Sequence, residues 1–258
     1  MPINFPHKPE VQLARPPLEE VVCQVRFPPI LRISREEPID LQERIRRRFP
    51  LLRLEQGVQV QFPVPGNPNA PSAEFKPKLY RFVSQDEQTA VSLTVNFYAV
   101  STHRYTHWQA FAADLQLVHD AVQQVYQPAY ATRIGLRYVN RLTLENTQTR
   151  HKDELFDLLR TELTAMLRGP VWQDATEMAC QLSFVEESAQ LNFSVAYEET
   201  EDPAFILDFD YFEKGKLPLD GLVERCDRYH TLIYDAFRYC LPDKTLQKFQ
   251  PVQIEGET

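Results

Sequence analysis

Glycine is scarce in this sequence, with only 7 residues in 258, and the glycine-containing motifs of several enzyme classes are missing. Neither G-x-x-x-x-G-K-S/T nor G-x-G-x-x-G occurs, so we do not expect a loop that cradles nucleotide phosphates. The G-x-S-x-G turn that presents a serine nucleophile is also missing. No motif in the chain therefore requires an enzyme, and no cofactor is expected.

Positive charge and long apolar runs are scarce as well. The net charge is −8, which argues against a general affinity for nucleic acid or for anionic lipid. No apolar run is long enough to span a membrane, and residues 1–20 lack the apolar stretch of a secretory signal. We therefore expect a cytoplasmic protein. Its cysteines form no C-x-x-C pair, which predicts buried free thiols at Cys23, Cys180, Cys226 and Cys240.

Proline is abundant instead, with 20 residues, and it gathers in two regions. One region covers the first 38 residues, and the other covers residues 62–78. The second region predicts a connection longer than usual, and such loops are either functional or mobile. A solvated excursion from a hairpin is the simpler interpretation.

The first half of the chain predicts short strands followed by one long helix. The predicted strands are residues 21–27, 58–62, 79–86 and 89–100, and a short helix covers 41–49. Within 89–100, alternate residues from Val91 to Ala99 are expected to face the core, whereas Ser92 to Tyr98 face the other way. Residues 106–126 carry apolar side chains at helical spacing.

The second half repeats this order. The predicted elements are a strand at 133–142, a helix at 152–168, strands at 178–187, 190–199 and 204–212, and a helix at about 219–241. Two such blocks can bury their apolar faces by sharing one sheet. We therefore predict a single α+β domain over 1–258 with two layers, a mainly antiparallel sheet and long helices on one face. The repeated halves are expected at about 16–145 and 146–250.

An arginine falls on every fourth residue of the strand at 133–142, at Arg133, Arg137 and Arg141. Alternate residues of a strand share a face, so the three point away from the apolar set that meets the helices. We call that side the open face, meaning the sheet face directed away from the long helices. Gly135 lies between two of the arginines and would let a ligand or another backbone approach closely.

Carboxylates are expected on the same open face. Asp208 and Asp210 share one side of the strand at 204–212, and Glu198 and Glu199 follow the strand before it. Arginine and carboxylate groups match as bidentate pairs. The set is either a ladder of surface ion pairs, or a concave polar surface for an anionic ligand or an acidic segment of a partner. The candidate binding residues are Arg133, Arg137, Asn140, Arg141, Asp208, Asp210 and His230.

His230 lies near the apolar stripe of the last helix. It is either a buried histidine tied to a neighbouring acid, or an acid or base that reaches Asp208. Asp208 and Asp210 offer two oxygen ligands to a divalent cation, but no third acidic ligand stands at a suitable spacing. His103 and His107 would suit zinc only on one helix, and Thr106 predicts a helix start between them. No metal is expected.

Three segments carry a resemblance to a known family: PPLEEVVCQVRF at 16–27, FYAVSTHRYTHWQAF at 97–111 and RIGLRYVNRL at 133–142. The chain resembles a sporadically distributed family of uncharacterised prokaryotic proteins of about this length. The resemblance implies an accessory role in a defence or mobile-element system.

Two functions follow as expectations. The first is a non-catalytic accessory protein that binds a protein partner through the open face and the proline-rich loop. The alternative is a small-molecule or nucleotide binder, or a hydrolase, that uses Arg137, Arg141, Asp208 and Asp210 in a cleft on the sheet.

Overall fold

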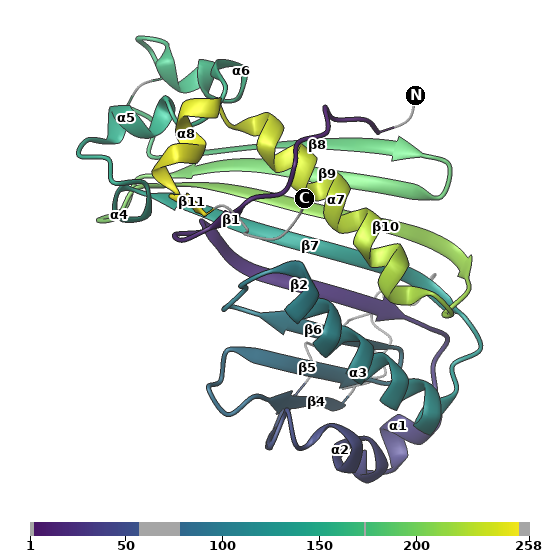
Figure 1. The fold of residues 1–258 in the computed structure, drawn as a ribbon. Coiled ribbons are helices and arrows are strands. Elements are labelled where there is room, and N and C mark those ends of the chain that lie inside the picture. Colours follow the sequence, from purple (N-terminus) through teal and green to yellow (C-terminus); the bar gives the residue numbers. More distant parts are fainter. Residues whose placement is uncertain (1–2, 57–77, 173, 253–258) are drawn as a thin grey trace, which may run out of the picture.

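The computed structural model describes residues 3–56, 78–172 and 174–252 (Figure 1). The predicted strand at 58–62 lies outside these residues, and so does the proline-rich loop at 62–78 apart from Lys78. None of the described helices is both long and apolar enough to cross a membrane.

One antiparallel sheet of nine strands forms the centre of the fold (Figure 1). From edge to edge its strands are β3 (Leu51–Gln56), β4 (Lys78–Val83), β5 (Thr89–Thr94), β6 (Phe97–Thr102), β2 (Leu18–Arg26), β7 (Ala131–Thr143), β10 (Ala204–Leu217), β9 (Ala189–Glu198) and β8 (Glu177–Glu186). Burial alternates along the inner strands, because one side of each strand meets the core. The predicted α+β class and antiparallel sheet are confirmed.

Two long helices cover one face of this sheet, as the helical spacing of apolar residues predicted (Figure 1). They are α3 (Trp108–Tyr126) and α7 (Leu222–Cys240), and their inward stripes belong to the main core. Shorter helices lie in the connections: α1 (Leu31–Arg35), α2 (Ile39–Ile45), α4 (Leu144–Thr147), α5 (Lys152–Phe156), α6 (Thr161–Thr164), the 3-10 helix η1 (Ala165–Arg168) and α8 (Asp243–Lys248). A separate two-stranded ladder joins β1 (Gln12–Leu13) to β11 (Pro251–Val252).

The strand order displays the internal repeat. In each half, a first strand is followed by short helices, then by a meander of strands, and finally by a long helix. The last strand of each meander, β6 or β10, pairs back onto the first strand, β2 or β7. The two first strands pair with each other at the centre of the sheet. This order places the division at residues 127–130, because β7 opens the second half rather than closing the first as the boundary at 145 implied.

The predicted single strand at 89–100 is wrong, because β5 and β6 form a hairpin there. The turn consists of Val95 and Asn96, and Leu93 pairs with Tyr98. A two-residue turn reverses the chain, so the residues that face the core change parity. Tyr98 consequently lies in the core, fully buried, instead of facing away from it.

The predicted continuous helix at 152–168 is also wrong. The segment forms α5, α6 and η1, with a break between residues 157 and 160. The backbone N–H of Arg160 donates to the carbonyl of Cys240, 2.9 Å away, at the end of α7. The adjacent Leu158 and Leu159 are both buried, which a helix on a sheet surface does not allow easily. Tertiary contacts therefore override the helical spacing here.

Candidate functional site

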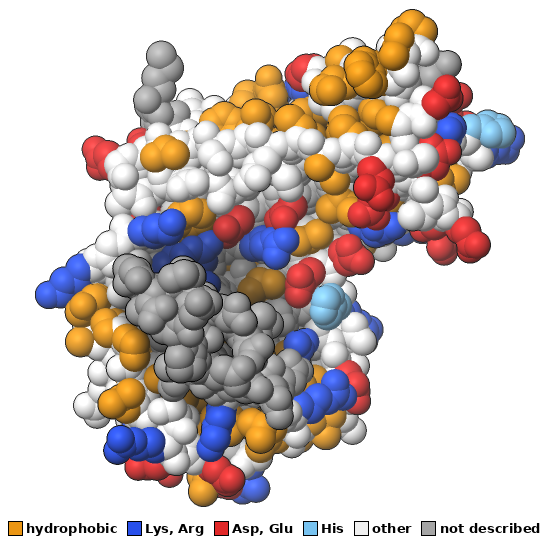
Figure 2. All heavy atoms as spheres, turned by 180° about the vertical axis from the view of Figure 1, so that it is seen from behind, with side chains coloured by type: hydrophobic (Ala, Val, Ile, Leu, Met, Phe, Trp, Pro, Cys, Tyr) orange, Lys and Arg blue, Asp and Glu red, His pale blue; other side chains and the backbone are white. Residues whose placement is uncertain are grey.

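Acidic and basic side chains gather on the open face of the sheet (Figure 2), and the strand register places the predicted arginines and aspartates among them. Arg137 on β7 is directly opposite Asp210 on β10, so the two side chains leave the sheet on the same side. The same register places Asp208 opposite Val139, on that side as well. Strand alternation therefore located these residues correctly.

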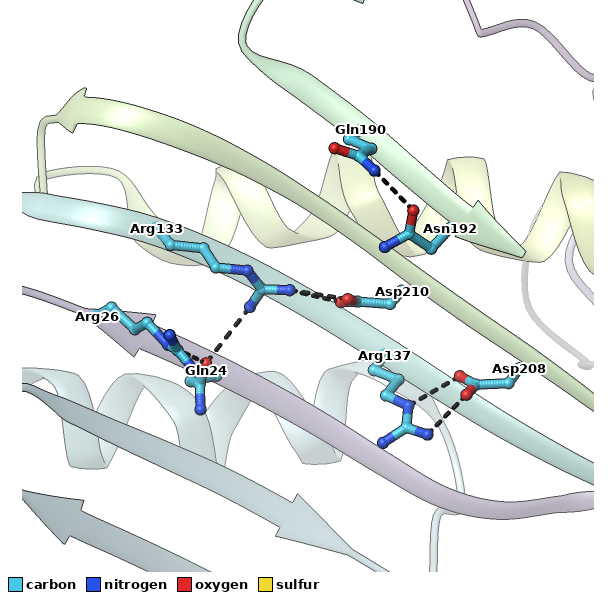
Figure 3. A network of polar contacts seen from close by, with 8 residues as sticks. All are labelled: Gln24, Arg26, Arg133, Arg137, Gln190, Asn192, Asp208 and Asp210. Carbon is cyan, nitrogen blue, oxygen red and sulfur yellow. Dashed lines mark hydrogen bonds and ion pairs between the residues drawn. The ribbon is translucent and has the colours of Figure 1, made fainter. Parts of the chain in front are cut away.

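The charges are paired with one another, as Figure 3 shows for two pairs. Nε and Nη2 of Arg137 donate to the two carboxylate oxygens of Asp208 at 2.8 and 2.6 Å. Nη2 of Arg133 donates to both oxygens of Asp210 at 2.8 and 2.9 Å. Arg141 donates to Glu198 at 3.3 Å. The pKa of Arg137 is raised above its usual value, mainly because its guanidinium donates hydrogen bonds to Asp208.

Gly135 makes room for the protein's own arginine rather than for a ligand. A Cβ atom at this position would lie 2.4 Å from Nη1 of Arg133. The Arg133 guanidinium also lies 4.3 Å from the ring centroid of Phe212, over the ring. An anion could bind here only by displacing an intramolecular carboxylate. The geometry is therefore that of an ion-pair ladder.

A metal site at Asp208 and Asp210 is not supported, because each carboxylate is held by an arginine. Among the residues that the structure describes, no group of three or more histidine, cysteine or acidic side chains could hold a metal ion. His107 is the N-cap of α3, and His103 precedes it, so the two do not share a helix. Glu199 forms an ion pair with Lys152 at 2.7 Å.

Asn140 and His230 lie on the other face of the sheet. Asn140 is buried, and its amide donates a long hydrogen bond of 3.4 Å to the carbonyl of Leu207. His230 projects from α7 toward β7 on the helix side. The hypothesis that His230 acts near Asp208 is therefore wrong, because the sheet separates them.

These two residues line a cavity of about 1270 Å³ on the helix side. Its walls come from β7, the start of α3, α7, α8 and the N-terminal segment 7–18. Apolar walls from Val11, Leu13, Leu18 and Phe237 are combined with many polar side chains: His7, Glu10, Gln12, Tyr105, Thr106, His107, Gln109, Tyr138, Asn140, His230, Tyr234 and Gln247. Small-molecule sites are concave and combine apolar walls with polar groups that fix the orientation of the ligand.

Residues 3–13, which we call the N-terminal strap, form the outer wall of the cavity and are tied to α7. The backbone N–H of Lys8 donates to Asp235 at 2.9 Å, and that of Val11 donates to the hydroxyl of Tyr234 at 3.1 Å. The Tyr234 hydroxyl donates in turn to the carbonyl of Pro9 at 3.2 Å. The β1–β11 ladder fixes the end of the strap.

His230 is the most unusual polar group in this cavity. Its Nδ1 lies 2.7 Å from the hydroxyl of Tyr138, and its ring stacks on Trp108 with centroids 4.8 Å apart. Among the described residues its Nε2 has no hydrogen-bond partner of suitable geometry, and the one charged group beside it is the carboxylate of Glu10, whose Oε2 lies 3.2 Å away. The side chain is only 5% exposed. Buried polar atoms normally have a partner, so this free nitrogen needs one.

The neighbouring phenols determine what this nitrogen can do. Burial raises the pKa of Tyr138 and of Tyr105 well above the usual range, so both hydroxyls keep their protons. The Tyr138 hydroxyl has two partners, the Tyr105 hydroxyl at 3.5 Å and Nδ1 of His230 at 2.7 Å. In the arrangement in which Tyr138 donates to the nearer Nδ1, a neutral His230 ring carries its proton on Nε2. That N–H group is then a hydrogen-bond donor for a molecule in the cavity. No lysine or arginine is among the residues that line the cavity.

Sequence reasoning found His230 and Asn140 but missed their surroundings. Helical spacing at 106–126 and alternation at 133–142 do not indicate that Trp108 and Tyr138 contact His230. Glu10 lies 220 residues from His230 in the chain, so no local pattern connects them. No family model matches this chain, and no curated protein matches it. The resemblance to a family of uncharacterised prokaryotic proteins therefore stays a prediction.

Proposed function

We propose that this protein binds a small, uncharged, largely apolar molecule in the cavity around His230, without transforming it. The observation that carries the proposal is the buried Nε2 atom of His230, which faces the cavity beside Glu10 and has no hydrogen-bond partner of suitable geometry among the described residues. A ligand with an acceptor atom would satisfy this nitrogen and gain the apolar contact of the surrounding walls.

The lining favours this ligand class over others. With no lysine or arginine at the walls, a phosphate or a polyanion would have no matching charge. The carboxylate of Glu10 adds repulsion toward anions. The rings of Tyr105, Tyr138 and His230 line the cavity and are tilted toward one another, which suits a flat, ring-bearing molecule. The lining offers no cysteine, serine or lysine as a nucleophile, so binding is favoured over covalent catalysis.

A neutral fluorescent probe tests the proposal directly. N-phenyl-1-naphthylamine should bind the purified chain with increased emission, because it fluoresces strongly only in apolar surroundings. Val11→Trp, on the wall of the cavity, should abolish this signal. Val171→Trp is the matched control, because Val171 is exposed and does not line the cavity. Absence of binding, or equal binding by both variants, would contradict the proposal.

A second candidate is partner binding on the open face, as an accessory protein of a prokaryotic defence or mobile-element system. The observation that favours it is the row of partly exposed ion pairs on the face directed away from α3 and α7, with the Arg137 side chain 48% exposed. Such pairs can exchange with charges of a partner. A pull-down with the wild type and with Arg137→Glu tests it. Recovery of the same proteins with both would exclude the open face as the interface.

A further inference from the structure

Strand β8 leaves one edge of the nine-stranded sheet unusually accessible. It is ten residues long and has no strand partner on its outer side among the described residues. Its sequence, EMACQLSFVE, contains no proline, glycine, lysine or arginine. Natural sheets usually protect their edges with such residues, with bulges or with a covering segment. An edge without these features is suited to pairing with another strand.

The helix side of β8 is apolar and exposed. Leu182 is 45% exposed and Phe184 is 37% exposed, whereas their partners on β9, Phe193 and Leu191, are buried. Cys180 is exposed on the same side, so the prediction that all four cysteines are buried is wrong for this residue.

The first half of the chain shows what such an edge looks like when it is covered. Strand β4 holds the place of β8 in the other half of the sheet. Its helix-side residues Tyr80 and Phe82 are only 4% and 0% exposed. Strand β3 continues the sheet beyond them, and the buried side chains of α1 and α2 join the same core. The second half has no strand equivalent to β3 in the described part of the chain, so its edge lacks this cover.

We propose that two copies of this chain pair through β8, antiparallel and about a twofold axis, to form one continuous sheet. This inference is independent of the ligand proposed above. The helices of both copies must lie on the same side of the joined sheet. Residues that lie directly opposite each other in the two copies of β8 then point to the same side of the sheet. An odd-numbered residue must therefore pair with an odd-numbered one, and an even-numbered residue with an even-numbered one.

The sequence of β8 complements itself in a register of this kind. With Gln181 opposite Gln181 of the second copy, Met178 faces Phe184 and Cys180 faces Leu182 across the axis. The Met178–Phe184 and Cys180–Leu182 pairs lie on the helix side and are apolar, whereas the central Gln181 pair lies on the open face. On the open face Ala179 faces Ser183. Glu177 and Glu186 are not placed opposite each other, because that arrangement would turn the helices of the two copies to opposite sides.

The centre of the fold already contains a joint of this type. Strands β2 and β7, one from each half, pair antiparallel with the long helices of both halves on one side (Figure 1). The N-terminal strap does not cover the middle of β8. Among the described residues, its contacts with β8 are near the end of the strand, where the ring of Phe5 lies 6.0 Å from that of Phe184 and the N–H of Ile3 donates to Glu186.

Sedimentation velocity of the whole chain tests the association. The wild type should sediment as a species of twice the chain mass of 30.1 kDa, with dissociation on dilution. Leu182→Lys should raise the dissociation constant by a factor of about ten or more, since it buries charge in the joint. Leu54→Lys is the matched control, because Leu54 is exposed on β3 at the opposite edge. Circular dichroism melts establish that both variants are folded.

Cross-linking tests the register. In a Cys180→Ser background, Gln181→Cys should form a disulfide between copies when diamide accepts the two electrons and two protons of the thiols. Ser183→Cys should not form this disulfide. In the proposed register, position 183 of one copy lies opposite Ala179 of the other, so the two introduced cysteines are four residues apart along the strands. A wild type that stays monomeric at about 200 µM, a concentration at which even weak interfaces associate, would overturn the proposal. A dimer that Leu182→Lys leaves intact, or cross-linking of Ser183→Cys but not Gln181→Cys, would overturn it equally.

Discussion

Tyr138 and His230 lie 92 residues apart in the chain, yet the hydroxyl of one is 2.7 Å from Nδ1 of the other. The contact joins the central strand β7 to α7 and faces the cavity. A second pair, Tyr98 and His119, has nearly the same geometry at 2.8 Å, but neither residue lines that cavity. The two pairs therefore allow the effect of a buried hydrogen bond to be separated from the effect of a ligand site.

Tyr138→Phe and Tyr98→Phe should both lower the free energy of unfolding by about 1–3 kcal/mol, because each leaves a buried histidine nitrogen without its partner. Urea denaturation measures this loss. Only Tyr138→Phe should weaken binding of N-phenyl-1-naphthylamine, since only that residue lines the cavity. Equal effects of both variants on probe binding would show that the cavity is not the binding site.

Gly135→Ala should destabilise the protein by about 1–2 kcal/mol, although the backbone there does not have a positive φ. The new methyl group displaces the Arg133 guanidinium from Asp210 and Phe212. In an Arg133→Ala background, Gly135→Ala should instead raise the free energy of unfolding, because alanine is favoured over glycine within a strand by about 0.5–1 kcal/mol. Urea denaturation of the four proteins of this cycle measures both values. Additive effects would contradict this account of Gly135.

The Arg137–Asp208 pair should contribute little to stability despite its bidentate geometry. Both side chains are in contact with solvent, so a double-mutant cycle with alanine should give a coupling energy of about 0.2–1 kcal/mol. The Arg133–Asp210 pair is less exposed and should couple more strongly. Raising the salt to about 1 M should weaken the first pair more than the second. A larger coupling energy for Arg137–Asp208 than for Arg133–Asp210 would argue that the open face is shielded from solvent.

Stability should fall in mild acid because of His119. Burial lowers the pKa of His119 below its usual value. The unfolded chain therefore binds a proton near pH 6.5, its ordinary pKa, while the folded chain does not. The neutral His119 side chain makes its full contribution to the free energy of unfolding above about pH 6.5. This contribution is lost as the pH falls toward the pKa of His119 in the folded chain, with a slope of at most about 1.4 kcal/mol per pH unit. His119→Gln should flatten this part of the profile of unfolding free energy against pH. An unchanged profile would mean that His119 titrates alike in both states.

The sequence by itself determined which side chains share a face of each strand and which stripe of each long helix is buried. Both follow from periods of two and 3.6 residues, which are local properties of the backbone. This is why Arg137 and Asp208 could be placed on one side of the sheet before the strand order was known. The open-face ladder was therefore predictable as a set of residues, but its pairing was not.

Tertiary structure decided the rest. The reversal at Val95 and Asn96 changed which residues face the core, and the contact between Arg160 and Cys240 broke a helix that spacing alone had extended. The cavity depends most on distant contacts, since Glu10, Tyr138 and His230 come from the N-terminal strap, β7 and α7, which are far apart in the sequence. Such contacts leave no periodic signal, because they arise from the packing of whole elements rather than from the spacing of residues within one.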